Sequence, residues 1–285
     1  MESYENKVYR KPHRKWGFRI FGREPFPEYF VILIGLNFIL KTMELFNENS
    51  KLASVIHRDH SLLPVINRLG IKLGFGDKTI RNICEEKGID LNFFVETINV
   101  FHYEAYFPEK RLLNFSVTMV IDYLIKTHQY YKDYLIPEND RLIELFLSAT
   151  PNENTENELV RKFYAKFKEE FVIHINFEER EMFPYILELN RVIENPESRE
   201  QFKLKYPEYS ISSFEKEHSA MDDKMDDLTN IIIKYLPPNY DQNRGNAFLS
   251  NLFLFEKDLK NHSRIEDHIM IPKVKQLEKL LVSDE

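Results

Sequence analysis

A histidine recurs in each of four long amphipathic segments of this chain, which span residues 111–135, 155–192, 210–236 and 244–282. The four are His128, His174, His218 and His262. Their intervals of 46, 44 and 44 residues place one imidazole at a comparable depth in each segment. This regular spacing predicts a bundle of four antiparallel helices, because short connections join neighbouring antiparallel helices.

The composition also favours helices. Of 285 residues only 8 are glycine and 13 are proline, so few tight turns are available for a many-stranded sheet. The hydrophobic fraction of 43% is enough for a core. We therefore predict an all-α protein. The net charge is −7, whereas binding a phosphate backbone usually requires a concentrated basic surface. We therefore expect no nucleic-acid partner.

Residues that typically begin or end helices divide the chain into three predicted regions. Residues 50–103 read as a small helical accessory domain, in which Asp77 and Asp90 begin helices and Gly88 ends one. Residues 111–285 read as the four-helix bundle.

Residues 1–49 read as a leader, or as an extension without a fold of its own if translation starts at Met43. The apolar run 29–40 follows a basic stretch. It has only twelve residues, too few for a helix to cross a bilayer. We therefore expect no stable membrane insertion, and a signal anchor is the less favoured alternative.

Two of the histidines begin the same local pattern. Glutamate follows each of them by four residues, and an apolar–proline pair follows at nine and ten, giving His174, Glu178 and Pro184 in one copy and His262, Glu266 and Pro272 in the other. The bundle therefore reads as a duplicated pair of helices. A single pair of this kind is usually a solvated surface couple, but two copies in register with two further histidines indicate a shared site.

The spacing of four places imidazole and carboxylate one helical turn apart on the same face, so both can bind one metal ion. Two such pairs, together with the two remaining histidines, predict a dinuclear site. Imidazole and carboxylate suit iron, manganese or zinc. Each ion keeps an open position for an exogenous ligand, which fits iron best. This pattern predicts a metal site and leaves open whether the protein is an enzyme.

The residues resemble the hemerythrin-like RIC family of iron–sulfur cluster repair di-iron proteins, over residues 50–285. The order of the ligands carries the resemblance, and the segments 178–184 and 217–218 also match it. The resemblance implies a hemerythrin-like antiparallel four-helix bundle holding two iron ions joined by oxo and carboxylate bridges. The histidines would be terminal ligands and the glutamates bridges: His128, His174, His218, His262, Glu178 and Glu266.

The family's function is repair of iron–sulfur clusters that oxidants or nitric oxide have damaged, in the cytoplasm, by iron donation or by handling nitric oxide. Its implied partners are iron–sulfur client proteins and the gases dioxygen and nitric oxide, and a homodimer is one assembly it allows. The alternative is a non-catalytic sensor or carrier of dioxygen or nitric oxide. A metal-free helical interaction protein is the third reading.

This chain departs from the family at two places. The turn that commonly carries a Cys-Cys pair reads Gly-Phe-Gly-Asp at residues 74–77, so no thiol chemistry applies there. Cys84, the single cysteine, is expected to be a small buried hydrophobic residue. Oxygen carriers also place a fifth histidine one turn after that of the third helix, where this chain has Asp222.

Overall fold

The computed structural model describes residues 44–148, 155–207, 210–235 and 240–283, without the side chains of residues 155, 156, 196, 213–220, 222 and 283. The expected leader up to residue 43, with its apolar run and Met43, therefore lies outside the described residues. Residues Leu45–Glu285 form one compact unit. Within the described ranges, no helix combines the length and apolar character that a bilayer crossing requires.

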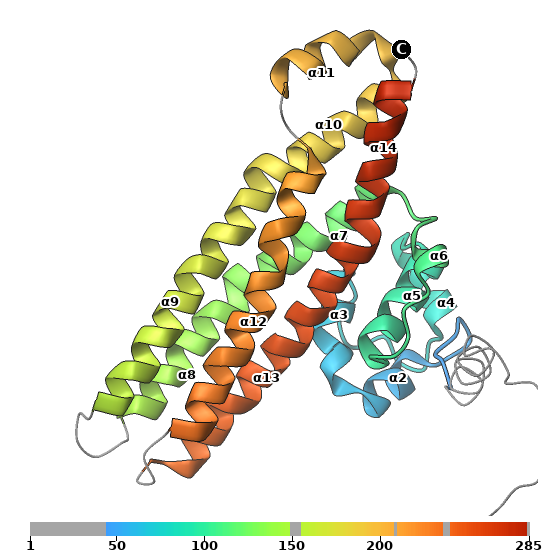
Figure 1. Cartoon of the computed structure of the whole chain (residues 1–285). Helices are drawn as coiled ribbons and strands as arrows, with labels where there is room; N and C mark the ends of the chain where they lie inside the picture. The colour runs from blue at the N-terminus through green and yellow to red at the C-terminus, as the bar shows by residue number, and fades with distance from the viewer. Residues whose placement is uncertain (1–43, 149–154, 208–209, 236–239, 284–285) are drawn as a thin grey trace, which may run out of the picture. The chain divides into compact units, whose positions relative to one another are not determined.

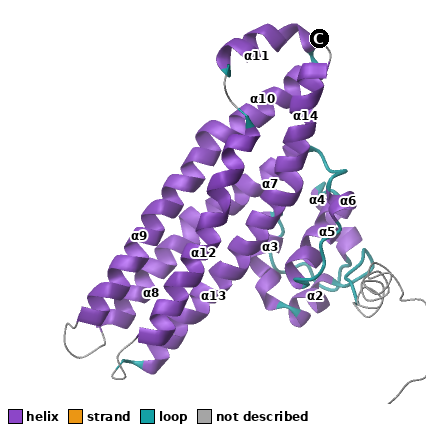
Figure 2. Cartoon of the chain, viewed as in Figure 1, coloured by secondary structure: helices purple, strands orange, loops and turns teal. Residues whose placement is uncertain are grey.

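Helices are the regular elements of the described chain, and the only β pairing there is one isolated bridge between Lys51 and Thr79 (Figure 2). The prediction of an all-α protein is confirmed. The predicted division into residues 50–103 and 111–285 stays a prediction.

Short helices make up the first part of the described chain: α2 (Leu52–Arg58), η1 (His60–Leu62), α3 (Leu63–Arg68), α4 (Ile80–Lys87), α5 (Leu91–His102) and α6 (Glu109–Leu112). As predicted, Gly88 ends α4 with a φ of 65°, and the Asp90 carboxylate accepts from the Phe93 N–H at 2.8 Å to begin α5. The prediction for Asp77 is wrong. Thr79 caps α4, because its hydroxyl accepts the N–H of Asn82 at 3.3 Å.

Four long antiparallel helices form the bundle (Figure 1). Three of them are interrupted by a π-helical turn. The first is α7 (Val117–Tyr130), η2 (Tyr131–Leu135) and α8 (Ile136–Ser148); the second is α9 (Thr155–Phe177), η3 (Glu178–Met182) and α10 (Phe183–Glu194); the third is α12 (Ile211–Tyr235); and the fourth is α13 (Gln242–Ile265), η5 (Glu266–Met270) and α14 (Ile271–Ser283). Two short helices, η4 (Pro196–Ser198) and α11 (Arg199–Lys205), connect the second to the third.

The predicted bounds of the first bundle helix, 111–135, are wrong at both ends. The helix starts at Val117, where the Ser116 hydroxyl accepts from the Met119 N–H at 3.2 Å. It then continues past Pro137 to Ser148. The proline does not stop it because a wide π turn precedes Pro137.

The three π turns share one backbone arrangement. In each, the N–H that follows the turn bonds to a carbonyl five residues earlier, from Ile136 to Tyr131, from Phe183 to Glu178 and from Ile271 to Glu266. Proline is the next residue in every case: Pro137, Pro184 and Pro272. A proline ring clashes with the carbonyl four residues before it and donates no hydrogen bond, and widening the preceding turn relieves that clash.

Aromatic rings fill the bundle core on one side of the π turns. Tyr131, Phe171 and Phe255, from three different helices, form a triangle with ring centroids 5.2–5.5 Å apart. Phe167 stacks on Phe171 at 5.7 Å. These buried rings belong to a larger apolar cluster that α8, α9, α12 and α13 share. The cluster holds the helices at fixed depth relative to one another.

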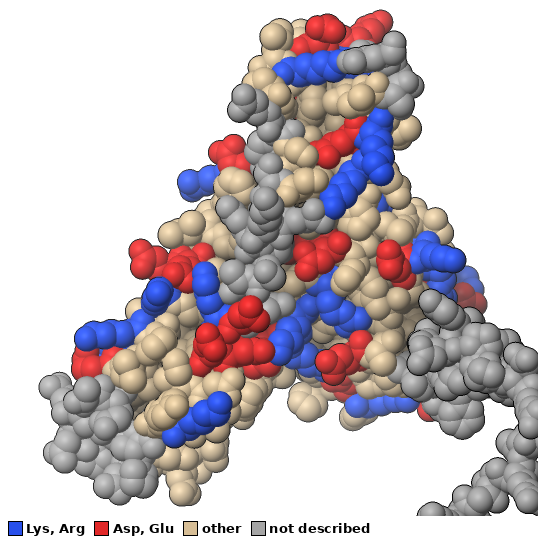
Figure 3. All heavy atoms as spheres, in the orientation of Figure 1, with Lys and Arg blue, Asp and Glu red and all other residues tan. Residues whose placement is uncertain are grey.

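Charged side chains of both signs are interspersed over the face of the molecule in Figure 3. Some of them join neighbouring helices, as Lys224 of α12 does with Glu170 of α9 at 2.8 Å and Lys260 of α13 with Asp226 of α12 at 3.1 Å. Since these pairs are partly exposed, they stabilise the bundle far less than the core does.

We predict that Phe255→Ala lowers the free energy of unfolding by about 3–5 kcal/mol, because it opens a cavity among the three rings. Urea unfolding of the metal-free protein measures the loss. The matched control is Phe253→Ala on the same helix, where the side chain is 47% exposed; it should change the value by less than about 0.5 kcal/mol. Equal losses in the two variants would contradict this account of the core.

Candidate metal centre

Two glutamates stand at the first residues of two π turns and are completely buried. Glu178 begins η3 and Glu266 begins η5, each with 0% exposure. His128 of α7 and His262 of α13 are buried beside them, with 0% and 2% exposure. One donor atom from each of the four side chains lies within 4.8 Å of all the others.

The contacts within this cluster are close. His128 Nε2 lies 3.1 Å from Glu178 Oε2 and 3.2 Å from His262 Nε2. His262 Nε2 lies 3.1 Å from Glu266 Oε1, and His174 Nε2 lies 3.0 Å from Glu178 Oε1. Both pairs spaced by four residues therefore meet on one face of their helices, as the helical period requires.

Five of the six predicted ligands are thus described, and four of them form the cluster. His174 contacts the cluster through Glu178 and is the most exposed of the five, with 12% of its side chain accessible. His218 lies in α12, but its side chain is outside the described part of the structure, as is that of Asp222. The assignment of these residues as ligands stays a prediction.

Aromatic rings enclose the cluster on two sides. The His128 imidazole stacks on Phe183, the first residue of α10, with centroids 5.5 Å apart and planes 19° apart. The Tyr131 ring meets the His262 ring edge-on at 5.7 Å. Because these rings limit the access of water, charges in the cluster interact more strongly than they would at the surface.

The donor set fits a metal ion. Burying two carboxylates without compensating positive charge is costly, and a divalent cation between them offsets that cost. Buried imidazole and carboxylate, with no thiolate in the cluster, are ligands that iron, manganese and zinc all accept. The geometry therefore supports a cation site and does not by itself distinguish these metals.

A chain of close polar contacts leads from the partly exposed Lys132 to His128. Lys132 donates to both carboxylate oxygens of Glu179 at 2.7 Å, and Glu179 Oε1 lies 3.2 Å from His128 Nδ1. Burial disfavours a charged imidazole, but the contacts with Glu178 and Glu179 outweigh it and raise the pKa of His128 to about 9. His128 and then Lys132 lower the pKa of Glu179 to about 2. Glu179 therefore stays ionised and can orient the imidazole.

Sequence reasoning missed several residues that shape this site. Glu179 sits beside a predicted ligand, but nothing local shows that its side chain reaches another helix. Pro137 follows His128 by nine residues, close to the spacing in the two recognised copies, and this third proline was a readable signal. The neighbours Tyr131 and Phe183 could be placed only by the packing.

The structure also places three residues outside the cluster, namely Asp267, His268 and Cys84. Asp267, five residues after His262, is exposed, whereas Glu266 is buried, which agrees with the helical period. His268 is also exposed. Cys84 is 1% exposed, so the expectation of a buried hydrophobic residue is confirmed. Burial raises the pKa of its thiol to about 11.

A protein-family model matches half of the chain. It is described as the Hemerythrin HHE cation binding domain and covers residues 132–274. The match includes every predicted ligand except His128, which lies four residues before it begins. No curated protein matches the chain.

We predict that Glu179→Gln weakens metal binding about 10- to 100-fold, because the residue that orients His128 loses its charge. Competition between the protein and a chelator for Fe²⁺ measures the affinity. Glu181→Gln changes an exposed residue of the same π turn and is the matched control. Equal affinities for the two variants would rule out the orienting role of Glu179.

We also predict that Cys84 reacts with iodoacetamide about 100-fold more slowly than an ordinary thiol at pH 8, since only the thiolate is nucleophilic and its pKa is raised. Mass spectrometry of timed samples gives the rate. Unfolding in urea should restore rapid labelling of one site per chain, because the sequence has a single cysteine. Rapid labelling of the folded protein would show that this thiol is accessible.

Proposed function

Because the chain belongs to the hemerythrin HHE cation-binding family, we propose that it is a di-iron protein that repairs iron–sulfur clusters damaged by oxidants or nitric oxide. The proposed ligands are His128, His174, His218, His262, Glu178 and Glu266. The observation that carries this proposal is the pair of fully buried carboxylates at the centre of four converging donor groups.

The two carboxylates suit a dinuclear rather than a mononuclear site. Each glutamate comes from a different helix and has an imidazole at 3.0–3.1 Å from its own helix, so the cluster contains two equivalent halves. Two histidines and two shared carboxylates would leave each ion short of six ligands. Bound iron would supply redox chemistry and an open position for a small molecule.

The surrounding residues control access to the site. The Phe183 and Tyr131 rings exclude water from the side of His128 and His262. His174 is the most exposed of the described candidate ligands, so the path past this residue is the shortest candidate route for an ion. A partly exposed ligand at one edge suits a site that releases iron to a client protein, because a single ligand can detach without opening the core.

We also place the protein in the cytoplasm and propose iron–sulfur proteins as its clients. With a single cysteine the chain forms no internal disulfide, so its fold does not depend on an oxidising compartment. The family turn with two cysteines is absent from the sequence, so repair by this chain would proceed without a thiol at residues 74–77.

We predict about two irons per chain after anaerobic purification, with charge-transfer absorption on oxidation, since the site has two halves. Elemental analysis and visible spectra measure both. The double variant His174→Ala, His262→Ala should lose the iron and the absorption. His268→Ala removes an exposed imidazole six residues after His262 and should keep both. Iron-free wild-type protein, or zinc that the double variant retains, would overturn the di-iron assignment.

Repair is tested separately by incubating the loaded protein with an iron–sulfur protein whose cluster nitric oxide has destroyed. Recovery of the client's activity, with matching loss of iron from the loaded protein, is expected under reducing conditions. Full retention of iron would exclude donation. A reversible spectral change with dioxygen or nitric oxide and no effect on the client would point to a carrier or sensor instead.

A further inference from the structure

Arg68 is the last residue of the short helix α3, and its charged side chain is buried beside the bundle. Its guanidinium donates two hydrogen bonds to Asp258 of α13, at 2.9 Å to Oδ2 and 2.6 Å to Oδ1. The two side chains are only 3% and 11% exposed, although 190 residues separate them in the chain. Bidentate pairs of this kind have a fixed geometry.

The same guanidinium also lies over aromatic rings of the first bundle helix. Its central carbon is 5.2 Å from the ring centre of Tyr130 and 5.7 Å from that of Tyr123, both in α7. Phe101 of α5 contributes a third ring at 5.6 Å. Cations are attracted to such ring faces, so Arg68 joins α7 and α13 through one group.

These two helices carry the histidines that meet at the metal centre. Asp258 lies four residues before His262, one turn away on the same face of α13. Tyr130 lies two residues after His128. The Nε2 atoms of the two histidines are 3.2 Å apart, so a small shift of either helix changes the distance between them.

We propose that Arg68 is a positioning residue for the metal centre, which sets the distance between His128 and His262 by joining α7 to α13. This inference rests on the proposed metal binding. The positioning role would give the short helices α2 to α6 a function at the site that does not require cysteine, because Arg68 of α3 holds two metal-binding helices in place.

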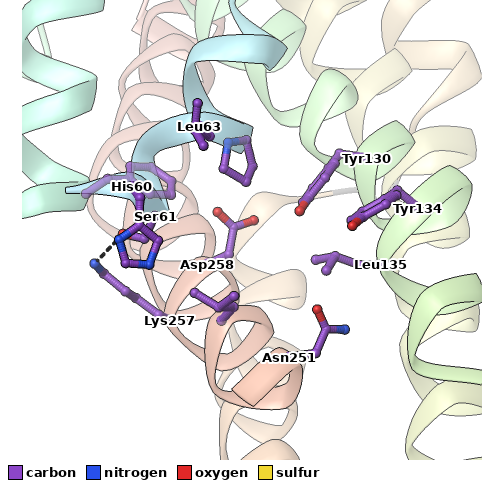
Figure 4. A pocket seen from close by; sticks show the side chains of 12 residues that line it. His60, Ser61, Leu63, Tyr130, Tyr134, Leu135, Asn251, Lys257 and Asp258 are labelled. Carbon is purple, nitrogen blue, oxygen red and sulfur yellow. Dashed lines mark hydrogen bonds between the residues drawn. The ribbon is translucent and has the colours of Figure 1, made fainter. Parts of the chain in front are cut away.

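A cavity of about 210 Å³ beside this pair provides a way to test the idea (Figure 4). Asp258, Tyr130 and Tyr134 line it, and Figure 4 shows the Asp258 carboxylate and the two tyrosine hydroxyls on its walls. Lys257 lines it as well and donates to the Ser61 hydroxyl at 2.8 Å. A small guanidine that enters this cavity can reach Asp258 when the arginine side chain has been removed.

The experiment uses Co²⁺ as the probe, because its visible bands report coordination geometry as well as affinity. In the full chain, Arg68→Ala should weaken Co²⁺ binding at least about tenfold and alter those bands, an effect like that of other residues that orient ligands. Millimolar methylguanidine should restore both, and methylammonium, which cannot bind bidentately, should not. Arg81→Ala, which removes a partly exposed arginine of α4, should behave like wild type.

A second variant separates positioning from folding. Arg68→Met with Asp258→Leu removes both charges and keeps an apolar contact, which proteins often tolerate. We expect circular dichroism and the thermal midpoint of its metal-free form to match wild type, while Co²⁺ affinity stays low. Recovery of affinity together with the fold would overturn the positioning role.

Two further results of the Co²⁺ experiment would each overturn a proposal. Folded Arg68→Ala protein that binds Co²⁺ with wild-type affinity and bands would overturn the inference alone. Wild-type protein that binds no Co²⁺ would overturn the proposed metal site and the inference with it.

Discussion

The burial of Glu178 and Glu266 is the constraint on which the rest of this structure depends. Two carboxylates without solvent contact destabilise an apolar core unless positive charge or a metal ion compensates them. The bundle places His128 and His262 within hydrogen-bonding distance of these groups. The aromatic packing around the cluster then makes the compensation stronger, because it excludes water.

The backbone is also irregular where the two glutamates are buried. Both glutamates open π turns, and a proline follows each turn at the point where a regular α-helix would clash with it. A third turn of this kind follows His128 on the first helix. Three of the four bundle helices therefore depart from α geometry near the candidate site, which is where π turns are often found in proteins.

The small helices are part of this arrangement through a single buried ion pair. Arg68 is costly to bury, and its contacts with Asp258 and three aromatic rings offset that cost. The pair lies one helical turn from His262. The proposed positioning role gives a physical reason for an ionic contact that two apolar residues could replace without loss of packing.

Local sequence patterns were sufficient to predict the helical class and the two His-x-x-x-Glu pairs, because helical periodicity decides which side chains share a face. They did not determine the length of the first bundle helix, since a proline ordinarily ends a helix and Pro137 is tolerated only because a π turn precedes it. Only the tertiary structure brought Glu179 to His128 and Arg68 to Asp258. These contacts join residues distant in sequence, and packing between helices decides them.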